Sequence, residues 1–329
     1  MIPLEFESQS VIPFTPMNPP SVSPLRTLFR RAAFVPFCGA LGLAAAGNVQ
    51  AAATVDLTSP TTGWTVIQYP NNNPDPSTDQ QTGSTEADIV GDALHPSFYT
   101  QFGNAGTPSL TDGTLAFRIR LGADQSPDGF KAALFVGIDA TGDGGIDLFL
   151  ASENTGNPDR IGIYNPGTGL NLSPNTTSIV ATPLVSYTPT ASNYYWAPVD
   201  PTIDPTVGTS TDMNIDGKVD HFLTFSLPFA DVVAQMAARN IVINQNSTFN
   251  YVLATSTQNN SLNQDLNGIG KGFINSTSTW AELGGLTSPI SASGVAVPEP
   301  DAAVCVGLGA VGLLAWRFRR SARKSSLVG

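Results

Sequence analysis

The stretch that decides the fold is Thr114–Leu121, with the sequence TLAFRIRL. Every second residue is apolar, and Arg118 and Arg120 fall on the opposite face, which is the period-two pattern of a strand packed on a core. The same alternation recurs in segments 134–138, 146–150, 223–227 and 249–253. Strands of this kind, separated by turns rich in Gly, Pro, Asn and Asp, predict an all-β fold, an antiparallel β-sandwich.

Weaker segments complete the prediction. Further strands are expected at 64–69, 160–164, 178–182 and 241–244. One short helix is expected over Ala230–Arg239, with Val233, Met236 and Ala237 on one side and Asn240 as its end. Segments 71–85 and 183–211 are expected to be loops because they are polar and rich in turn residues.

The composition excludes two classes of protein. The 329 residues include 26 Asp and Glu against 15 Lys and Arg, which disfavours a nucleic-acid binder because phosphate backbones need basic partners. With two His and two Cys in the whole chain, a zinc site built on those ligands is not expected either.

Both ends of the chain have the pattern of address signals. Near the N-terminus, three arginines precede an apolar run over 32–46 and the small residues of Val49-Gln50-Ala51, which predicts a secretory signal peptide over 1–51. The alternative is a membrane anchor, for which the run is short. At the other end, Pro298-Glu299-Pro300 precedes an apolar stretch over 302–316 and a basic cluster.

This C-terminal arrangement resembles the PEP-CTERM sorting signal of Gram-negative bacteria. The resemblance covers residues 297–324 and implies a transmembrane helix, cleavage near Pro298-Glu299-Pro300 by the membrane protease exosortase, and transfer to the cell surface or matrix. The basic cluster is expected to stay cytoplasmic, which places the preceding residues outside the inner membrane. The expected division is a signal peptide over 1–51, a sandwich over 52–283, a linker over 284–297 and the sorting signal over 298–324.

The region between the two signals is strongly acidic. Residues 52–297 hold 22 acidic residues against seven basic ones, a net charge of −15, and both cysteines lie outside this range. Such a surface repels nucleic acid and attracts divalent cations.

Two acidic loops carry the clearest chemical pattern. The first acidic loop, residues 139–147, and the second acidic loop, residues 212–220, place side-chain oxygens at positions 1, 3, 5 and 9 and Gly at position 6. Calcium takes about six to eight oxygen ligands, which alternate positions of a tight loop can direct at one centre. The predicted ligands are Asp139, Thr141, Asp143, Gly145 and Asp147 in the first loop, and Asp212, Asn214, Asp216, Lys218 and Asp220 in the second, with Gly145 and Lys218 acting through their carbonyls.

Several alternatives accompany this calcium hypothesis. The loops lack the Glu of an EF-hand at position 12 and look more like the strand–loop–strand calcium loops of integrin-type propellers. The same residues also suit a plain hairpin turn. We expect both loops at one end of the sandwich, where calcium would rigidify them, while Asp265-Leu-Asn267-Gly268 is expected to be a turn.

Segments around these loops are similar to DOMON-like domains and family-nine carbohydrate-binding modules. They include LFVGID before the first loop and DHFLTFSLPFADVV from the end of the second, where Pro228 and Phe229 would lead a strand into a short helix. The resemblance implies a jelly-roll sandwich and transfers no binding residue. Tyr195 and Trp196 are candidate sugar-stacking residues, because flat aromatic faces pack on sugar rings; the alternative is that they belong to the core.

No enzyme is expected. Residues 52–297 contain no Cys, and nothing isolates a catalytic pair among carboxylates such as Glu86, Asp88 and Glu153. The expected function is that of an exported, calcium-stabilised, non-enzymatic surface or matrix protein associated with exopolysaccharide or biofilm. The alternatives are a structural surface protein without a specific ligand and a hydrolase acting on polysaccharide.

Overall fold

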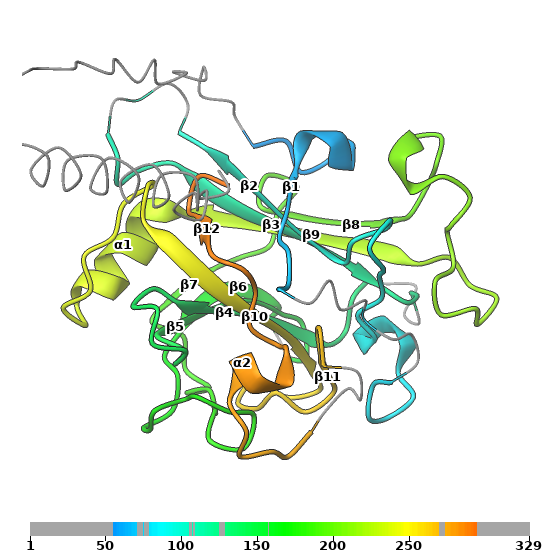
Figure 1. Ribbon diagram of the computed structural model, residues 1–329. Helices are drawn as coiled ribbons and strands as arrows, with labels where there is room; N and C mark the ends of the chain where they lie inside the picture. The colour runs from blue at the N-terminus through cyan, green and yellow to red at the C-terminus, as the bar shows by residue number, and fades with distance from the viewer. Residues whose placement is uncertain are drawn as a thin grey trace, which may run out of the picture. The chain divides into compact units, whose positions relative to one another are not determined.

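The computed structural model describes residues 55–70, 75, 79–104, 107, 109–124, 129–156, 158–269 and 274–294. These residues form two antiparallel sheets packed on a shared core, an all-β sandwich as predicted (Figure 1). The predicted signal peptide (1–51) and sorting signal (298–324) lie outside the described residues. Within the described ranges, no helix is both long and apolar enough to cross a membrane.

The first sheet is built around the strand Thr114–Leu121. Its five strands, in spatial order, are β1 (Thr65–Val66), β2 (Phe98–Gly103), β3 (Thr114–Leu121), β9 (His221–Pro228) and β8 (Tyr194–Pro198). β3 has the predicted bounds and pairs along its whole length with β9, from Thr114 opposite Pro228 to Leu121 opposite His221. β3 is therefore the middle of its sheet, with β2 on its other side.

The second sheet has seven strands. Six lie in the order β11 (Asp265–Leu266), β10 (Thr248–Ser256), β4 (Ala133–Asp139), β5 (Leu148–Glu153), β6 (Arg160–Tyr164) and β7 (Val185–Tyr187). The seventh, β12 (Ile290–Ser291), pairs with the start of β10. The helices are α1 (Phe229–Ala237) and α2 (Trp280–Leu283), and three 3₁₀ turns are η1 (Thr61–Gly63), η2 (Thr85–Ala87) and η3 (Pro205–Val207).

The main core lies between the two sheets. The apolar face of β3 packs there against the inward residues of β4, β9 and β10, and every residue of that face is fully buried. Aromatic rings join the sheets: the centroids of Phe117 in β3 and Tyr251 in β10 are 5.5 Å apart, edge to face. Because each fully buried large side chain contributes roughly 1.5–3 kcal/mol, this face provides much of the stability.

The outer face of the second sheet is covered as well. Phe135, Phe149 and Tyr164 form a second buried cluster with Trp280 of α2. The short helix α2 is fixed by a capping box between Thr279 and Glu282, and the Trp280 indole donates to the Asn171 carbonyl at 3.1 Å. β4 is consequently buried on both faces, which explains its nearly continuous apolar sequence.

The outer face of the first sheet buries two arginines. Arg118 is 3% exposed and donates to the carbonyls of Leu57 and Ser59, while its guanidinium lies 4.4 Å from the Trp64 ring centroid. Arg120 is 1% exposed and forms an ion pair of 2.6 Å with Asp220, which is itself fully buried. Both arginines face away from the main core, as the alternation predicted, and other segments cover them from outside.

Some predicted elements differ from the observed ones. The segments 178–182 and 241–244 are not strands, and the first makes only one isolated bridge, Ile179 to Pro166. β1 is two residues long where six were expected. The predicted loop 183–211 contains β7 and β8.

The helix and linker predictions also need adjustment. α1 begins one residue early, directly after Pro228 as expected, and buries Phe229, Val232 and Met236 where Val233, Met236 and Ala237 were expected to share one side. Asn240 adopts a φ of 64° just beyond it. The expected linker boundary at 284 is too early, because β12 lies within it and Ile290 is buried in the main core.

We predict that Arg120→Met lowers the free energy of unfolding by about 3–5 kcal/mol, because it leaves the Asp220 carboxylate buried without its partner. Chemical denaturation measures this directly. Lys131→Met is the matched control: Lys131 is 42% exposed and its nitrogen lies 3.9 Å from Asp159, so the loss should be about 1 kcal/mol or less. Equal stability of Arg120→Met and the parent would contradict a buried ion pair.

Candidate metal-binding loops and a buried acidic cluster

The two acidic loops lie at opposite ends of the sandwich. The first follows β4, whose last residue, Asp139, pairs with Asn250 near the start of β10. The second precedes β9 and reaches the other end, where Asn214 donates to Asp88 at 3.4 Å. That end is the end of β10, because Thr255 donates to the carbonyl of Ala87. The expectation that both loops share one end is therefore wrong (Figure 1).

The two loops nevertheless have the same internal hydrogen bonds. In each, the position-6 amide donates to the position-1 carboxylate, the position-7 amide to position 5, and the position-2 amide to position 9. In the first loop these are Gly144 to Asp139 (2.9 Å), Gly145 to Asp143 (2.9 Å) and Ala140 to Asp147 (2.8 Å). In the second they are Gly217 to Asp212 (2.9 Å), Lys218 to Asp216 (2.8 Å) and Met213 to Asp220 (3.0 Å). The two acidic loops, which lie at opposite ends of the sandwich, thus have the same local fold.

The backbone conformation of the loops agrees too. Position 6 is Gly in both, with a φ of 84° at Gly144 and at Gly217. Position 4 also has a positive φ, 74° at Gly142 and 56° at Ile215. A β-branched residue in this region is strained, and Ile215 is 87% exposed, so no packing compensates for it. The second loop therefore adopts the same backbone conformation at position 4 as the first loop, although Ile215 is unfavourable there.

The carboxylates of the first acidic loop repel one another. Burial raises the pKa of Asp147, and the charges of Asp139 and Asp143 raise it further against the hydrogen bonds from the loop amides. Thr141 donates weakly to Asp139 at 3.4 Å. The three carboxylates thus lie close enough to interact, with Gly145 buried at position 7.

In the second acidic loop, position 3 is the informative residue. Asn214 is 6% exposed, and while its amide nitrogen donates to Asp88, its oxygen Oδ1 is buried and has no hydrogen-bond partner. A buried polar atom without a partner costs about 1–3 kcal/mol. The oxygen lies at the position where the calcium pattern places a ligand.

The remaining residues of this loop are more engaged. Both Arg120 and the amide of Met213 bind the carboxylate of Asp220, whose burial raises its pKa to about 6. Lys218 lies 3.8 Å from the carboxylate of Asp216. Asp220 is therefore already held in the buried ion pair, and a bound ion would share this carboxylate with Arg120.

A third acidic group was not predicted from the sequence. Asp75, Asp79 and Asp265 each place one carboxylate oxygen within 4.8 Å of the others. In the described part of the chain, they make up the one group of three or more acidic, His or Cys side chains that close together. Asp265 was expected to be part of a plain turn. We call this group the buried acidic cluster.

The cluster is anchored by backbone amides. Asp265, fully buried in β11, accepts from the amides of Ile89 at 2.6 Å and Leu266 at 2.7 Å. Asp75, 4% exposed, accepts from Gly268 at 3.3 Å through Oδ2. Burial raises the pKa of both carboxyls well above the ordinary range, and the nearby charges of Asp79 and Asp88 raise both further.

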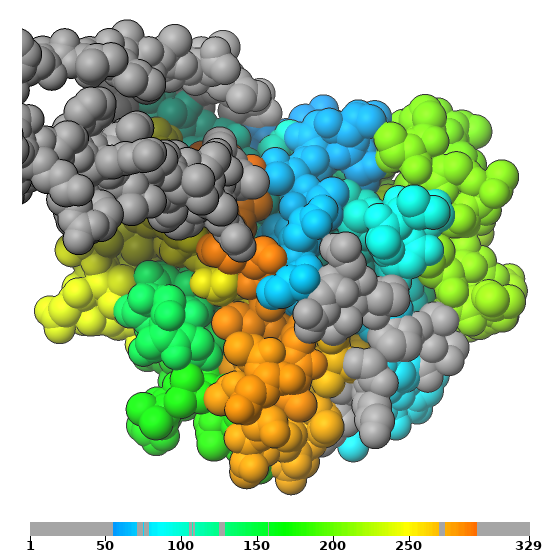
Figure 2. Space-filling model, in the orientation of Figure 1, coloured from blue at the N-terminus to red at the C-terminus, as the bar shows by residue number. Residues whose placement is uncertain are grey.

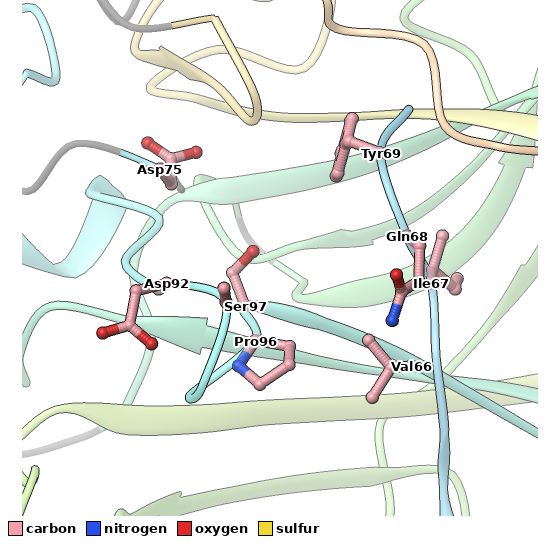
Figure 3. A pocket seen from close by; sticks show the side chains of 10 residues that line it. Val66, Ile67, Gln68, Tyr69, Asp75, Asp92, Pro96 and Ser97 are labelled. Carbon is pink, nitrogen blue, oxygen red and sulfur yellow. The ribbon is translucent and has the colours of Figure 1, made fainter. Parts of the chain in front are cut away.

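A pocket lies beside the cluster. Asp75 lines it together with Tyr69, Asp92 and Ser97 (Figure 3). The Tyr69 hydroxyl accepts from Asn267 at 2.8 Å, and Asn267 accepts from Ser97 at 3.1 Å. Asn267 thus links Tyr69 and Ser97, two residues that line the pocket together with Asp75.

Tyr195 and Trp196 do not form a common surface. They are neighbours on β8 and so point to opposite faces of the sheet. Trp196 packs against the main core, stacked on His221 with 4.8 Å between ring centroids, whereas Tyr195 packs against the outer cluster. A flat two-residue platform for a sugar is therefore not present.

The other carboxylates considered for catalysis are dispersed. Glu153 is 1% exposed and pairs with Arg160 at 2.9 Å. Glu86 is buried in η2, and Asp88, next to that turn, is fully buried and interacts electrostatically with the acidic cluster. His221 has a lowered pKa because it is buried.

Comparison with protein-family models, curated proteins and solved structures finds no match for this chain.

We predict that Ile215→Asn raises the free energy of unfolding by about 1 kcal/mol, because Asn tolerates the positive φ that strains a β-branched residue. Denaturant titration without added calcium gives the value. Asn240→Ile, at a φ of 64°, is the reverse control and should lower stability by a similar amount. A loss of stability in Ile215→Asn would show that the φ of 56° is not strained.

Proposed function

We propose that this protein is an exported, non-enzymatic component of the cell surface or extracellular matrix of a Gram-negative bacterium, whose sandwich is stabilised by calcium in its acidic loops. The observation that carries the calcium hypothesis is the buried Oδ1 of Asn214, which lacks a hydrogen-bond partner at a ligand position. The shared hydrogen-bond pattern of the two loops supports the same reading of the first loop.

In the second loop, the proposed ligands are the carboxylates of Asp212 and Asp216, Oδ1 of Asn214 and the carbonyl of Lys218. Asp220 completes the loop through its remaining lone pairs while it pairs with Arg120. Calcium suits such a set because it accepts irregular oxygen shells. In the first loop, the corresponding ligands are Asp139, Thr141, Asp143, Asp147 and the Gly145 carbonyl.

Calcium would act at both ends of the sandwich, since the loops lie at opposite ends. It would neutralise part of the −15 charge of residues 52–297 and could bridge the domain to an acidic exopolysaccharide. The finer fold proposal is a jelly-roll sandwich of the DOMON-like kind, supported by the passage of β9 through Pro228 into α1.

The proposed route to the surface depends on the two ends of the chain. The signal peptide over 1–51 would direct export, and the tail over 298–324 would hold the chain in the inner membrane until exosortase cuts near Pro298-Glu299-Pro300. Partners are therefore exosortase and, in the matrix, polysaccharide of a biofilm.

We predict that millimolar calcium raises the melting temperature of the full chain, purified in mild detergent, by several degrees over the value in EGTA. A ligand at 100 times its dissociation constant adds about 2.7 kcal/mol to stability. Asp212→Asn combined with Asp216→Asn should remove the part of this shift that the second loop contributes, while keeping the acceptors for the loop amides. Asp159→Asn, on an exposed carboxylate, is the control and should keep it. Equal melting in calcium and EGTA would refute calcium binding.

We predict that replacing Pro298-Glu299-Pro300 with Ala-Ala-Ala stops processing in the native host. The uncut chain should then accumulate in the inner-membrane fraction, where immunoblotting shows it as the longer species. Replacement of Ser291 and Ser293 with Ala, upstream of the motif, is the control for altered sequence near the tail. Unchanged processing of the triple-alanine variant would argue against exosortase.

A further inference from the structure

We propose that the buried acidic cluster of Asp75, Asp79 and Asp265 is a calcium site of its own, separate from the two acidic loops. The proposal does not depend on calcium binding by either loop. It concerns carboxylates brought together from two distant segments of the chain and held at the margin of β11.

The spacing of the oxygens fits a calcium ion. One oxygen of each carboxylate lies within 4.8 Å of the others. Calcium–oxygen distances of about 2.3–2.6 Å allow ligand pairs up to roughly 4.6–5.2 Å apart across the ion. Magnesium, at about 2.0–2.1 Å, demands a tighter octahedron and gives up its water reluctantly. The three oxygens are thus close enough together to be ligands of one calcium ion.

The buried carboxylates of the cluster would be stabilised by a cation. Asp75 is 4% exposed, and its Oδ1 is buried without a hydrogen-bond partner, although Oδ2 accepts from Gly268. The charges that act most strongly on Asp75 belong to three other carboxylates, those of Asp265, Asp79 and Asp88. Several carboxylates of one sign in a buried site are strongly unfavourable unless a proton or a cation compensates.

The surroundings have the features of a metal site. Backbone amides hold the ligands in place: those of Ile89 and Leu266 bind the two oxygens of Asp265, and that of Gly268 binds Oδ2 of Asp75. The pocket of Figure 3, which Asp75 lines, gives an ion a path from solvent. Asp88 lies between this cluster and Asn214 of the second loop, so the two sites would be electrostatic neighbours.

The first test counts ions. In a loop-silenced chain, Asp139, Asp143, Asp212 and Asp216 are all changed to Asn, and calcium bound after equilibrium dialysis of the full chain is measured by elemental mass spectrometry. We expect one calcium per chain to remain, and none after Asp75→Asn is added. Absence of calcium in the loop-silenced chain, or its retention after Asp75→Asn, would overturn the proposal. If the loops do not bind calcium, the parent chain also shows one ion, so the two hypotheses fail separately.

The second test looks for a reversal in stability. In EGTA at neutral pH, Asp75→Asn should raise the melting temperature by roughly 2–4 °C because it relieves repulsion among carboxylates. In millimolar calcium the same variant should melt below the parent, because it has lost a charged ligand. A purely structural role gives the same sign in both conditions and would overturn the site.

Two further variants serve as a control and as a substitute for Asp75→Asn. Asp92→Asn changes a carboxylate that lines the same pocket but lies outside the cluster, so its calcium count and its shift in calcium should equal those of the parent. Asp79→Asn serves if Asp75→Asn does not fold, since Asp79 is less buried. The same reversal of sign is expected for it.

Discussion

Two guanidinium groups buried on the outer face of β3 constrain the rest of this sandwich. A buried arginine must find acceptors for its fixed donors, and neither neighbouring strand alone can supply them. Arg118 takes the carbonyls of Leu57 and Ser59, which draws the chain before β1 across the sheet. Arg120 takes Asp220, which fixes the last residue of the second acidic loop at the start of β9. The position of a candidate metal loop thus follows from a buried ion pair on the outer face of the first sheet.

The acidic residues fall into groups with different origins. Each acidic loop is made by nine consecutive residues, so its shape is encoded locally and appears twice with the same hydrogen bonds. The buried cluster is made by tertiary folding, because Asp265 of β11 meets Asp75 and Asp79 from the other end of the domain. Asn214 and Asp88 connect the second loop with this cluster, so the loop and the cluster meet at one end of the sandwich.

The sequence predicts best where strands alternate strictly. β3 and β6 have the predicted bounds, and β4, β9 and β10 contain the predicted alternating residues. The sequence did not predict β8 as a strand, because its adjacent aromatic residues YYW obscure the alternation of apolar and polar residues. It did not predict β2 either, because FYTQFG alternates only in part. The acidic loops were visible as a local spacing. The buried cluster was not, because no pattern in one segment indicates which carboxylates will meet across about 190 positions.

The pairing of β12 with β10 determines when the domain can be completed. Ile290 and Ala292 belong to the main core, the amide of Ser288 binds the carbonyl of Gln68 beside β1, and Figure 2 shows these first and last segments side by side in blue and orange. A ribosome delivers residues 288–292 after almost everything they contact. The core therefore lacks the side chains of Ile290 and Ala292 until this segment has been synthesised. Truncation before residue 290 would remove β12 from the start of β10 and take two buried side chains out of the main core.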